Sequence, residues 1–401
     1  MLGIYVHLPF CRVHCSYCPF AISTDIELQD RYVDALVREI QSPFNRPSGT
    51  ASALCETKGH TMPSRRTPSG LAPQIEERVP EGRAWDVDTI YFGGGTPSRT
   101  SISNLRRLIA AIRSTFAVSA GAEFSLEANP EDVTPEALDA WRDLGVNRIS
   151  IGVQSFHDDE LKAIGRIHDA RGAIAAVERA AQSGVRTNLD LILGLPHQTR
   201  ESFAKTLGEA IALDPGHLSL YMLDLDETTP LQVQVAKGRV DVPDDELVAG
   251  QYKHAIERLE AAGLHQYEIS NFARSGEECR HNLRYWTRGE YRGFGLAAHS
   301  FLGERRFANT RNIREYIDDP EHAQNFEEDL GEDERRRETL FLGLRRTSGL
   351  DYDQLVALCG QEAIEWVSRG LRDGWLERHE GRVVFTPSGF LLSNDYISQL
   401  F

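Results

Sequence analysis

The chain has 401 residues, of which 41% are hydrophobic and 26% are charged, and its formal net charge is −16. This composition is ordinary for a globular protein, and the length suggests two or three domains. The negative balance argues against nucleic acid as a partner and against broad attachment to an anionic membrane, because both depend on Lys and Arg.

No apolar run approaches the ~20 residues that a membrane span needs. The first residues, MLGIYVHLPF, lack the basic start and long apolar core of a signal peptide. The six cysteines are too few and too scattered for a disulfide scaffold. We therefore expect a cytoplasmic protein without a transmembrane segment.

Three closely spaced cysteines stand near the start of the chain. Cys11, Cys15 and Cys18 have C-x3-C-x2-C spacing and follow a short apolar run, Ile4–Val6. A cubane 4Fe–4S cluster normally takes four thiolates, so three thiolates leave one iron with a site for a substrate or cofactor. Zinc with a histidine as fourth ligand, and cysteines that bind nothing, are alternatives that the spacing leaves open.

Strand-like and helix-like segments alternate over residues 1–225. The predicted strands are Ile4–Val6, Thr89–Phe92, Glu123–Ala128, Arg148–Val153, Asn188–Leu193 and His217–Leu223. The predicted helices are Leu28–Ile40, Ile102–Phe116, Pro135–Leu144, Ala170–Ser183 and Glu201–Leu213. This alternation predicts an α/β fold with a parallel sheet and crossover helices. Six such units favour a partial (β/α)6 barrel over a closed eightfold one.

Polar or glycine-rich motifs follow four of these strands. They are Gly93–Pro97, Glu127–Pro130, Gln154–Phe156 and Gly194–Pro196. Active sites of β/α barrels form at this rim, where the carboxyl ends of the strands meet. Taken singly, each motif has a plainer interpretation: the glycines suit a tight turn, and the glutamate suits a surface position.

Residues 43–86 interrupt the alternation. They are rich in Pro, Ser, Gly, Thr and Arg and have no clear period. We interpret them as a mobile insertion, which costs a barrel little because loop-closure entropy grows slowly with length. Cys55, inside this segment, is interpreted as a bystander.

The pattern changes after residue 225. Residues 226–325 contain a predicted helix, Glu246–Ala262, and a predicted strand, Tyr267–Phe272, which indicates an α+β extension. Residues 326–401 combine helices with a short hairpin pattern, which is typical of a small winged-helix-like domain. Such a domain often binds DNA, but the acidic composition argues against that role here.

Five segments together resemble one family. They are Tyr5–Cys11, Gly93–Ser98, Gly152–Phe156, Asp190–Pro196 and Tyr267–Ala273. With the cysteine loop they resemble the radical S-adenosylmethionine (SAM) superfamily, and within it the oxygen-independent coproporphyrinogen III oxidase-like group. The resemblance covers most of the chain apart from residues 43–86.

Two features favour the heme-chaperone branch of that group. The oxidases carry a further cysteine two residues after the third cluster ligand, and this chain has Phe20 there. The oxidases also carry an N-terminal extension before the cluster loop, whereas here the loop lies almost at residue 1.

The resemblance implies two cofactors, a 4Fe–4S cluster on Cys11, Cys15 and Cys18, and SAM on the open iron. The residues that it implies in SAM binding are Tyr5, Tyr17, Gly94, Gly95, Thr96, Glu127, Gln154, Arg166 and Asp190. Arg166 would meet the SAM carboxylate with two hydrogen bonds. Asp190 lies inside an apolar run and needs a polar partner, for which a structural salt bridge would also serve.

His281, Tyr285 and Trp286 match the HNxxYW motif that the resemblance connects with heme binding. A neutral imidazole can ligate heme iron, and Tyr and Trp can pack on a porphyrin face. Without the resemblance, the same residues are more typical of a hydrogen-bonded core histidine beside packed aromatic rings.

The expected function is that of a heme chaperone-like radical SAM protein. It would carry heme as cargo to heme-dependent proteins, including membrane respiratory enzymes. The alternative is an oxygen-independent coproporphyrinogen III oxidase, which acts in porphyrin biosynthesis, and a radical SAM modification enzyme is a third class. Whether the chain is an enzyme stays open, although the chaperone is favoured over the oxidase.

Overall fold

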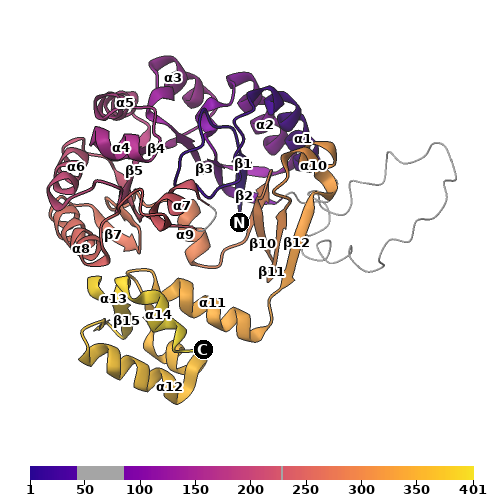
Figure 1. Cartoon of the computed structure of the whole chain (residues 1–401). Coiled ribbons are helices and arrows are strands. Elements are labelled where there is room, and N and C mark those ends of the chain that lie inside the picture. The colour runs from indigo at the N-terminus through magenta and orange to yellow at the C-terminus, as the bar shows by residue number, and fades with distance from the viewer. Residues whose placement is uncertain (43–84, 227–228) are drawn as a thin grey trace.

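The computed structural model describes residues 1–42, 85–226 and 229–401. Within these ranges twelve strands form one sheet, in the order β12-β11-β10-β9-β1-β2-β3-β4-β5-β6-β8-β7. Its middle is the predicted partial barrel, with helices on the outside, and a smaller C-terminal domain lies beside it (Figure 1). The predicted fold class is confirmed. The predicted insertion, residues 43–86, lies outside the described residues except for its last two, and so does Cys55.

The parallel strands form the centre of the molecule. They are β1 (Leu2–Leu8), β2 (Asp86–Gly94), β3 (Ala117–Ala128), β4 (Arg148–Gln154), β5 (Arg186–Leu193) and β6 (His217–Met222). Their apolar, β-branched residues are buried on both faces, and every residue of β4 is buried. Strand β3 begins well before its predicted start at Glu123. The prediction missed its first residues because they are mostly exposed and carry no apolar pattern.

Helices connect these strands and cover the outer face of the barrel (Figure 1). They are α1 (Gln29–Gln41), α2 (Ile102–Thr115), α3 (Pro135–Asp143), α4 (Asp158–Ala163), α5 (Ala170–Ser183) and α6 (Arg200–Ala212). Local sequence sets their starts: Thr134 caps α3 with Pro135 at its first position, and Thr199 forms a capping box on α6. The main apolar core lies between these helices and the sheet, where Val6, Leu36 and Leu108 are fully buried.

The α+β extension continues the same sheet at both of its edges. Strand β9 (Tyr291–Phe294) pairs parallel to β1, and β8 (Asn271–Ala273) pairs antiparallel to β6. The single strand predicted over Tyr267–Phe272 is wrong, because the chain turns there between β7 (His265–Glu268) and β8. The other elements are α7 (Pro230–Ala236), α8 (Asp245–Ala261), α9 (Arg280–Trp286), β10 (His299–Leu302), β11 (Arg305–Asn309), α10 (Ile313–Asp318) and β12 (Gln324–Asp329).

The C-terminal domain combines helices with a small antiparallel sheet in the order β13-β15-β14. Its elements are α11 (Glu332–Leu344), β13 (Leu350–Asp351), α12 (Tyr352–Arg372), β14 (Leu376–His379), β15 (Arg382–Phe385), α13 (Pro387–Leu391) and α14 (Ser393–Ser398). Trp366 lies at its centre, stacked on Tyr396 with 4.6 Å between the ring centroids. None of the helices that the structure describes is long and apolar enough to cross a lipid bilayer.

Candidate functional site

A cavity of about 500 Å³ opens at the carboxyl ends of the parallel strands. This is within the range of roughly 300–1,000 Å³ found for small-molecule sites. The predicted site residues that line it are Cys11, Cys15, Tyr17, Cys18, Gly94, Gly95, Thr96, Glu127, Gln154, Arg166 and Asp190. The cavity therefore brings together residues from the cysteine loop and from four neighbouring strands.

The cysteine loop follows β1, and backbone hydrogen bonds fix its start and close a turn within it. The Cys11 N–H donates to the Ser23 carbonyl at 2.9 Å, and the Cys18 N–H donates to the Cys15 carbonyl at 3.2 Å. The Thr96 hydroxyl donates to the Cys11 sulfur at 3.3 Å. In the described part of the chain, no group of three or more Cys, His, Asp or Glu side chains is placed so that it could hold one metal ion.

The donor set of this loop fits an iron–sulfur cluster. Burial raises the pKa of Cys18 to about 11 and also raises the pKa of Cys11. Buried thiols of this kind become thiolates when a metal or a cation compensates their charge. Arg166 lies 3.9 Å from the Cys15 sulfur, so a permanent cation stands beside the loop. Three sulfur ligands on one loop are the donors that iron–sulfur clusters take.

The glycine run after β2 is required by the protein itself. A Cβ atom on Gly95 would lie 2.5 Å from the backbone carbon of Pro9, and Gly94 has φ of +112°. Only glycine is tolerated at such a close approach and at such a backbone angle. The tight-turn interpretation therefore holds here. The close contact that requires glycine is with Pro9, in the segment that leads into the cysteine loop.

Glu127 ends strand β3 with its carboxylate facing the cavity. The Tyr91 hydroxyl donates to its Oε1 at 2.9 Å, and the Gly94 N–H donates to its Oε2 at 3.0 Å. Burial and then the nearby Asp190 raise the pKa of Glu127 to about 7, while these two hydrogen bonds oppose the rise. Glu127 is thus a half-buried carboxylate on the cavity wall, rather than the outer-surface carboxylate that the sequence left open.

Asp190 has the polar partners that its apolar surroundings require. It accepts hydrogen bonds from the Ser150 hydroxyl at 3.0 Å and from the Asn188 side-chain amide at 2.8 Å. Burial raises the pKa of Asp190. These hydrogen-bond partners are a neutral hydroxyl and a neutral amide, whereas the sequence analysis also considered a salt bridge.

Arg166 and Gln154 also line the cavity, with Gln154 at the end of β4 and Arg166 in the segment between α4 and α5. One terminal nitrogen of Arg166 donates to the Asn129 side chain and to the Gly152 carbonyl, both at 2.7 Å. The Nε of Arg166 is buried without a hydrogen-bond partner among the described residues. Gln154 has φ of +67°, a backbone angle that is costly for a residue with a side chain.

Tyr5 does not line the cavity. Its hydroxyl pairs with the His7 imidazole at 3.2 Å, and its ring stacks on Tyr91 with 6.2 Å between centroids. Tyr5 therefore lies behind the wall, next to a cavity residue that the sequence did not single out. Tyr91 could have been found from the strand alternation, because it points to the same side as Gly93, two residues later.

The predicted heme residues lie apart from this cavity, on helix α9. His281 is 1% exposed, its Nδ1 pairs with the Thr89 hydroxyl at 2.9 Å, and its Nε2 pairs with the Tyr285 hydroxyl at 2.8 Å. Trp286 lies beside the buried carboxylate of Glu268 and opposes the rise of its pKa. Burial lowers the pKa of His281 to about 3, so its ring is neutral. His281 is thus enclosed by its neighbours, whereas Tyr285 and Trp286 are half-buried.

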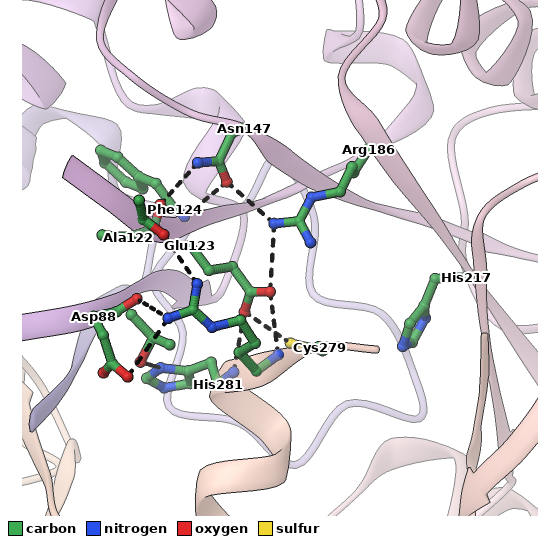
Figure 2. Close-up of polar contacts among 12 residues, drawn as sticks. Asp88, Ala122, Glu123, Phe124, Asn147, Arg186, His217, Cys279 and His281 are labelled. Carbon is green, nitrogen blue, oxygen red and sulfur yellow. Dashed lines mark hydrogen bonds and ion pairs between the residues drawn. The ribbon is translucent and has the colours of Figure 1, made fainter. Parts of the chain in front are cut away.

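Glu123 on β3 holds the start of helix α9 (Figure 2). Its carboxylate accepts hydrogen bonds from the backbone N–H groups of Arg280 at 3.1 Å and His281 at 3.0 Å. The Cys279 thiol donates to the same carboxylate at 3.5 Å, and Arg186 pairs with it at 3.5 Å. The helix is therefore fastened to the barrel wall through one buried acid.

Two family models match the chain. The model of the radical SAM superfamily matches residues 5–210, and the model of the HemN C-terminal domain matches residues 330–392. Among curated relatives, a protein named heme chaperone HemW from Bacillus subtilis is 33% identical, over 98% of this chain and 98% of its own. A protein of the same name from Mycobacterium tuberculosis is also 33% identical, over 99% of this chain and 94% of its own.

A solved structure shares the fold of the described residues. It is that of coproporphyrinogen III oxidase (HemN) from Escherichia coli, with a TM-score of 0.79 and 24% sequence identity. The match covers 100% of this chain and 89% of that one.

Proposed function

Because this chain belongs to the radical SAM superfamily and, within it, to the family of the heme chaperone HemW, we propose that it is a radical SAM-type heme chaperone. It binds a 4Fe–4S cluster on Cys11, Cys15 and Cys18, binds SAM beside the cluster, and carries heme. It acts in the cytoplasm and delivers heme to heme-dependent proteins, among them membrane respiratory enzymes. The radical SAM barrel, the extension and the C-terminal domain correspond to residues 1–225, 226–325 and 326–401.

The observation that carries this proposal is the convergence of unrelated motifs on one cavity. Three thiols from one loop share it with Glu127, Arg166 and Asp190, which come from different strands or their connections. When bound, the cluster and SAM supply one-electron chemistry that no side chain provides. The cysteine sulfurs would hold the iron, and the Arg166 guanidinium lines the cavity as a cation suited to an anionic group such as the SAM carboxylate.

Glu127 and Asp190 give the other side of the same pocket its negative character. Glu127 suits the ammonium or ribose hydroxyls of SAM. Asp190 is a second acid, near enough to raise the pKa of Glu127. The nine residues proposed for SAM are Tyr5, Tyr17, Gly94, Gly95, Thr96, Glu127, Gln154, Arg166 and Asp190. Tyr5 acts from behind the wall, because it does not line the cavity itself.

Heme binding is proposed for helix α9, through His281, Tyr285 and Trp286. In the conformation described, both ring nitrogens of His281 are hydrogen-bonded. Ligation of heme iron by His281 therefore requires the ring to leave Thr89 or Tyr285. Heme uptake at α9 is for this reason coupled to a local opening of the helix.

The alternative function, an oxygen-independent coproporphyrinogen III oxidase, is less favoured because of Phe20. This side chain stands where the oxidases have a further cysteine, and it lines the cavity with 61% of its surface exposed. The oxidases thus have a thiol at this position of the pocket, whereas this chain has an apolar aromatic ring.

Anaerobic reconstitution tests the proposal. The wild-type protein is expected to hold iron and sulfide in near-equal amounts and, on heme titration, to develop a shifted Soret band. The triple variant Cys11→Ala, Cys15→Ala, Cys18→Ala is expected to lose the iron and sulfide. Cys359→Ala, which removes a buried cysteine from the C-terminal domain, serves as the matched control and should keep both.

A parallel assay offers coproporphyrinogen III and heme to the same reconstituted protein. Heme binding without SAM-dependent decarboxylation supports the chaperone. Turnover of coproporphyrinogen would replace the chaperone by the oxidase, and iron retained by the triple cysteine variant would overturn the cluster assignment.

A further inference from the structure

Helix α9 and the candidate SAM cavity are linked through an aromatic side chain, Tyr91. The imidazole of His281 stacks on the Tyr91 ring, with 5.2 Å between centroids and 28° between planes. His281 is in turn held by Thr89 and Tyr285. The face of α9 that carries the HNxxYW histidine therefore forms the support on which Tyr91 rests.

Tyr91 reaches from this support into the cavity. It lies on β2, lines the cavity, and donates its hydroxyl to Glu127 Oε1 at 2.9 Å. The ring of Tyr5 also stacks on it, with 24° between planes. With one Glu127 oxygen held by Tyr91 and the other by the Gly94 N–H, the carboxylate is fixed in one orientation. Its remaining lone pairs are those available to a ligand in the cavity.

We propose that Tyr91 is a positioning residue of the SAM pocket, and that helix α9 takes part in that pocket by setting the Tyr91 ring. The inference rests on the proposed function, because it assumes that this cavity binds SAM. It assigns to the HNxxYW helix a second task besides heme binding. It also means that His281→Ala disturbs the SAM pocket and the proposed heme site together.

The pKa of Glu127 distinguishes this proposal from a purely structural role of Tyr91, because only the loss of the hydrogen bond to Glu127 would change it. The Tyr91 hydrogen bond lowers the pKa of Glu127 against the effect of burial, so its loss should raise that pKa further. The other groups that act on or face Glu127 remain in place in such a variant. They are Asp190, Arg148, Tyr5, Tyr221 and Tyr285.

The experiment compares reconstituted wild type, Tyr91→Phe and Tyr252→Phe. Tyr252 is the matched control, because it is a buried tyrosine whose hydroxyl donates to the Ile269 carbonyl on another part of the chain. SAM affinity is measured by equilibrium dialysis across pH 6 to 8.5, and the electron paramagnetic resonance spectrum of the reduced cluster is recorded with and without SAM. Tyr91→Phe is expected to bind SAM about tenfold more weakly at neutral pH. The pH at which affinity is half lost should move upward.

A second pair of variants tests the part played by α9. His281→Phe keeps an aromatic ring under Tyr91 and should lose less SAM affinity than His281→Ala, which should show a loss similar to that of Tyr91→Phe. A SAM affinity and pH midpoint in Tyr91→Phe equal to those of wild type would overturn the proposal, and so would equal SAM binding by His281→Ala. If the wild type itself binds no SAM, the proposed function fails instead.

Discussion

Two glutamates, Glu127 and Glu268, lie in different surroundings, although the pKa of each is raised. Burial raises the pKa of each to about 7. Glu127 faces a cavity and a second acid, Asp190, whereas Glu268 is 0% exposed and is enclosed by the Ser270 N–H, Asn271 and Trp286. A shifted pKa marks a functional site only when it also faces a place for a ligand. Glu268 is thus a structural acid at the base of the β7–β8 hairpin.

Glu268→Gln is expected to change how the stability of the protein depends on pH. In the unfolded chain this carboxyl has a pKa of about 4.3, and in the folded protein its pKa is about 7. Between these values only the folded state keeps the proton, so wild-type stability from this group falls as pH rises. The stability of Glu268→Gln relative to wild type should therefore increase by about 3 kcal/mol from pH 4.5 to pH 7.

Urea denaturation of both proteins across this pH range measures the difference. Comparing the two removes the opposing effect of buried neutral histidines such as His7, whose lowered pKa favours folding at higher pH. A difference that does not vary with pH would show that Glu268 is ionised in the folded protein at every pH tested.

Helix α9 is the element on which the two proposed sites depend. It has 7 residues, too few to be stable alone, so contacts with the barrel must hold it in place. Glu123 supplies them at the start of the helix, and Arg284 pairs with Asp88 and donates to the Met1 carbonyl at 2.9 Å further along. The barrel wall and the HNxxYW motif are consequently one structural unit.

Glu123→Ala is expected to lower the free energy of unfolding by about 3 kcal/mol, because it leaves Arg186 and two helix N–H groups without their buried partner. Glu123→Gln keeps an acceptor and should cost less. Chemical denaturation measures both, and Glu209→Ala, an exposed position on α6, should leave the stability unchanged. Equal stability of Glu123→Ala and wild type would show that other contacts suffice to hold α9.

At the scale of the whole molecule, helix α11 joins the C-terminal domain to the extension (Figure 1). Glu338 on this helix pairs with Arg288 at 2.9 Å and with Arg306 on β11. The backbone continues the connection, because the Ile269 N–H donates to the Arg345 carbonyl at 3.0 Å. The C-terminal domain is therefore fastened next to the β7–β8 hairpin, whose Glu268 contacts Trp286 of α9.

Glu338→Ala is expected to loosen this attachment without unfolding the barrel. Amide hydrogen exchange in α11 should become about tenfold faster, the equivalent of ~1.4 kcal/mol, while exchange in β4 stays the same. Glu365→Ala, at an exposed position on α12, is the control within the same domain. Unchanged exchange in α11 would mean that the backbone contacts alone maintain the attachment.

The sequence by itself determined the features that depend on neighbouring residues. The cysteine spacing, the strand–helix alternation and the Thr134–Pro135 helix start are local patterns, and the structure has the alternation and the helix start where they were predicted. The meeting of three of the four strand-end motifs at one cavity also followed, because the carboxyl ends of parallel strands share one edge of a sheet. The fourth motif, Gly194–Pro196, does not line this cavity.

Only the tertiary structure decided which side chains face each other across the barrel. Tyr91 lies far from His281 and Glu127 in sequence, and no local pattern predicts that it contacts both. The same holds for the two edges of the parallel sheet, where β9 pairs with β1 from the other end of the chain and β8 pairs with β6 across the intervening helices α7 and α8. Strand pairing and side-chain contacts over such separations depend on how the packed elements fit together, which periodicity and spacing along the chain do not record.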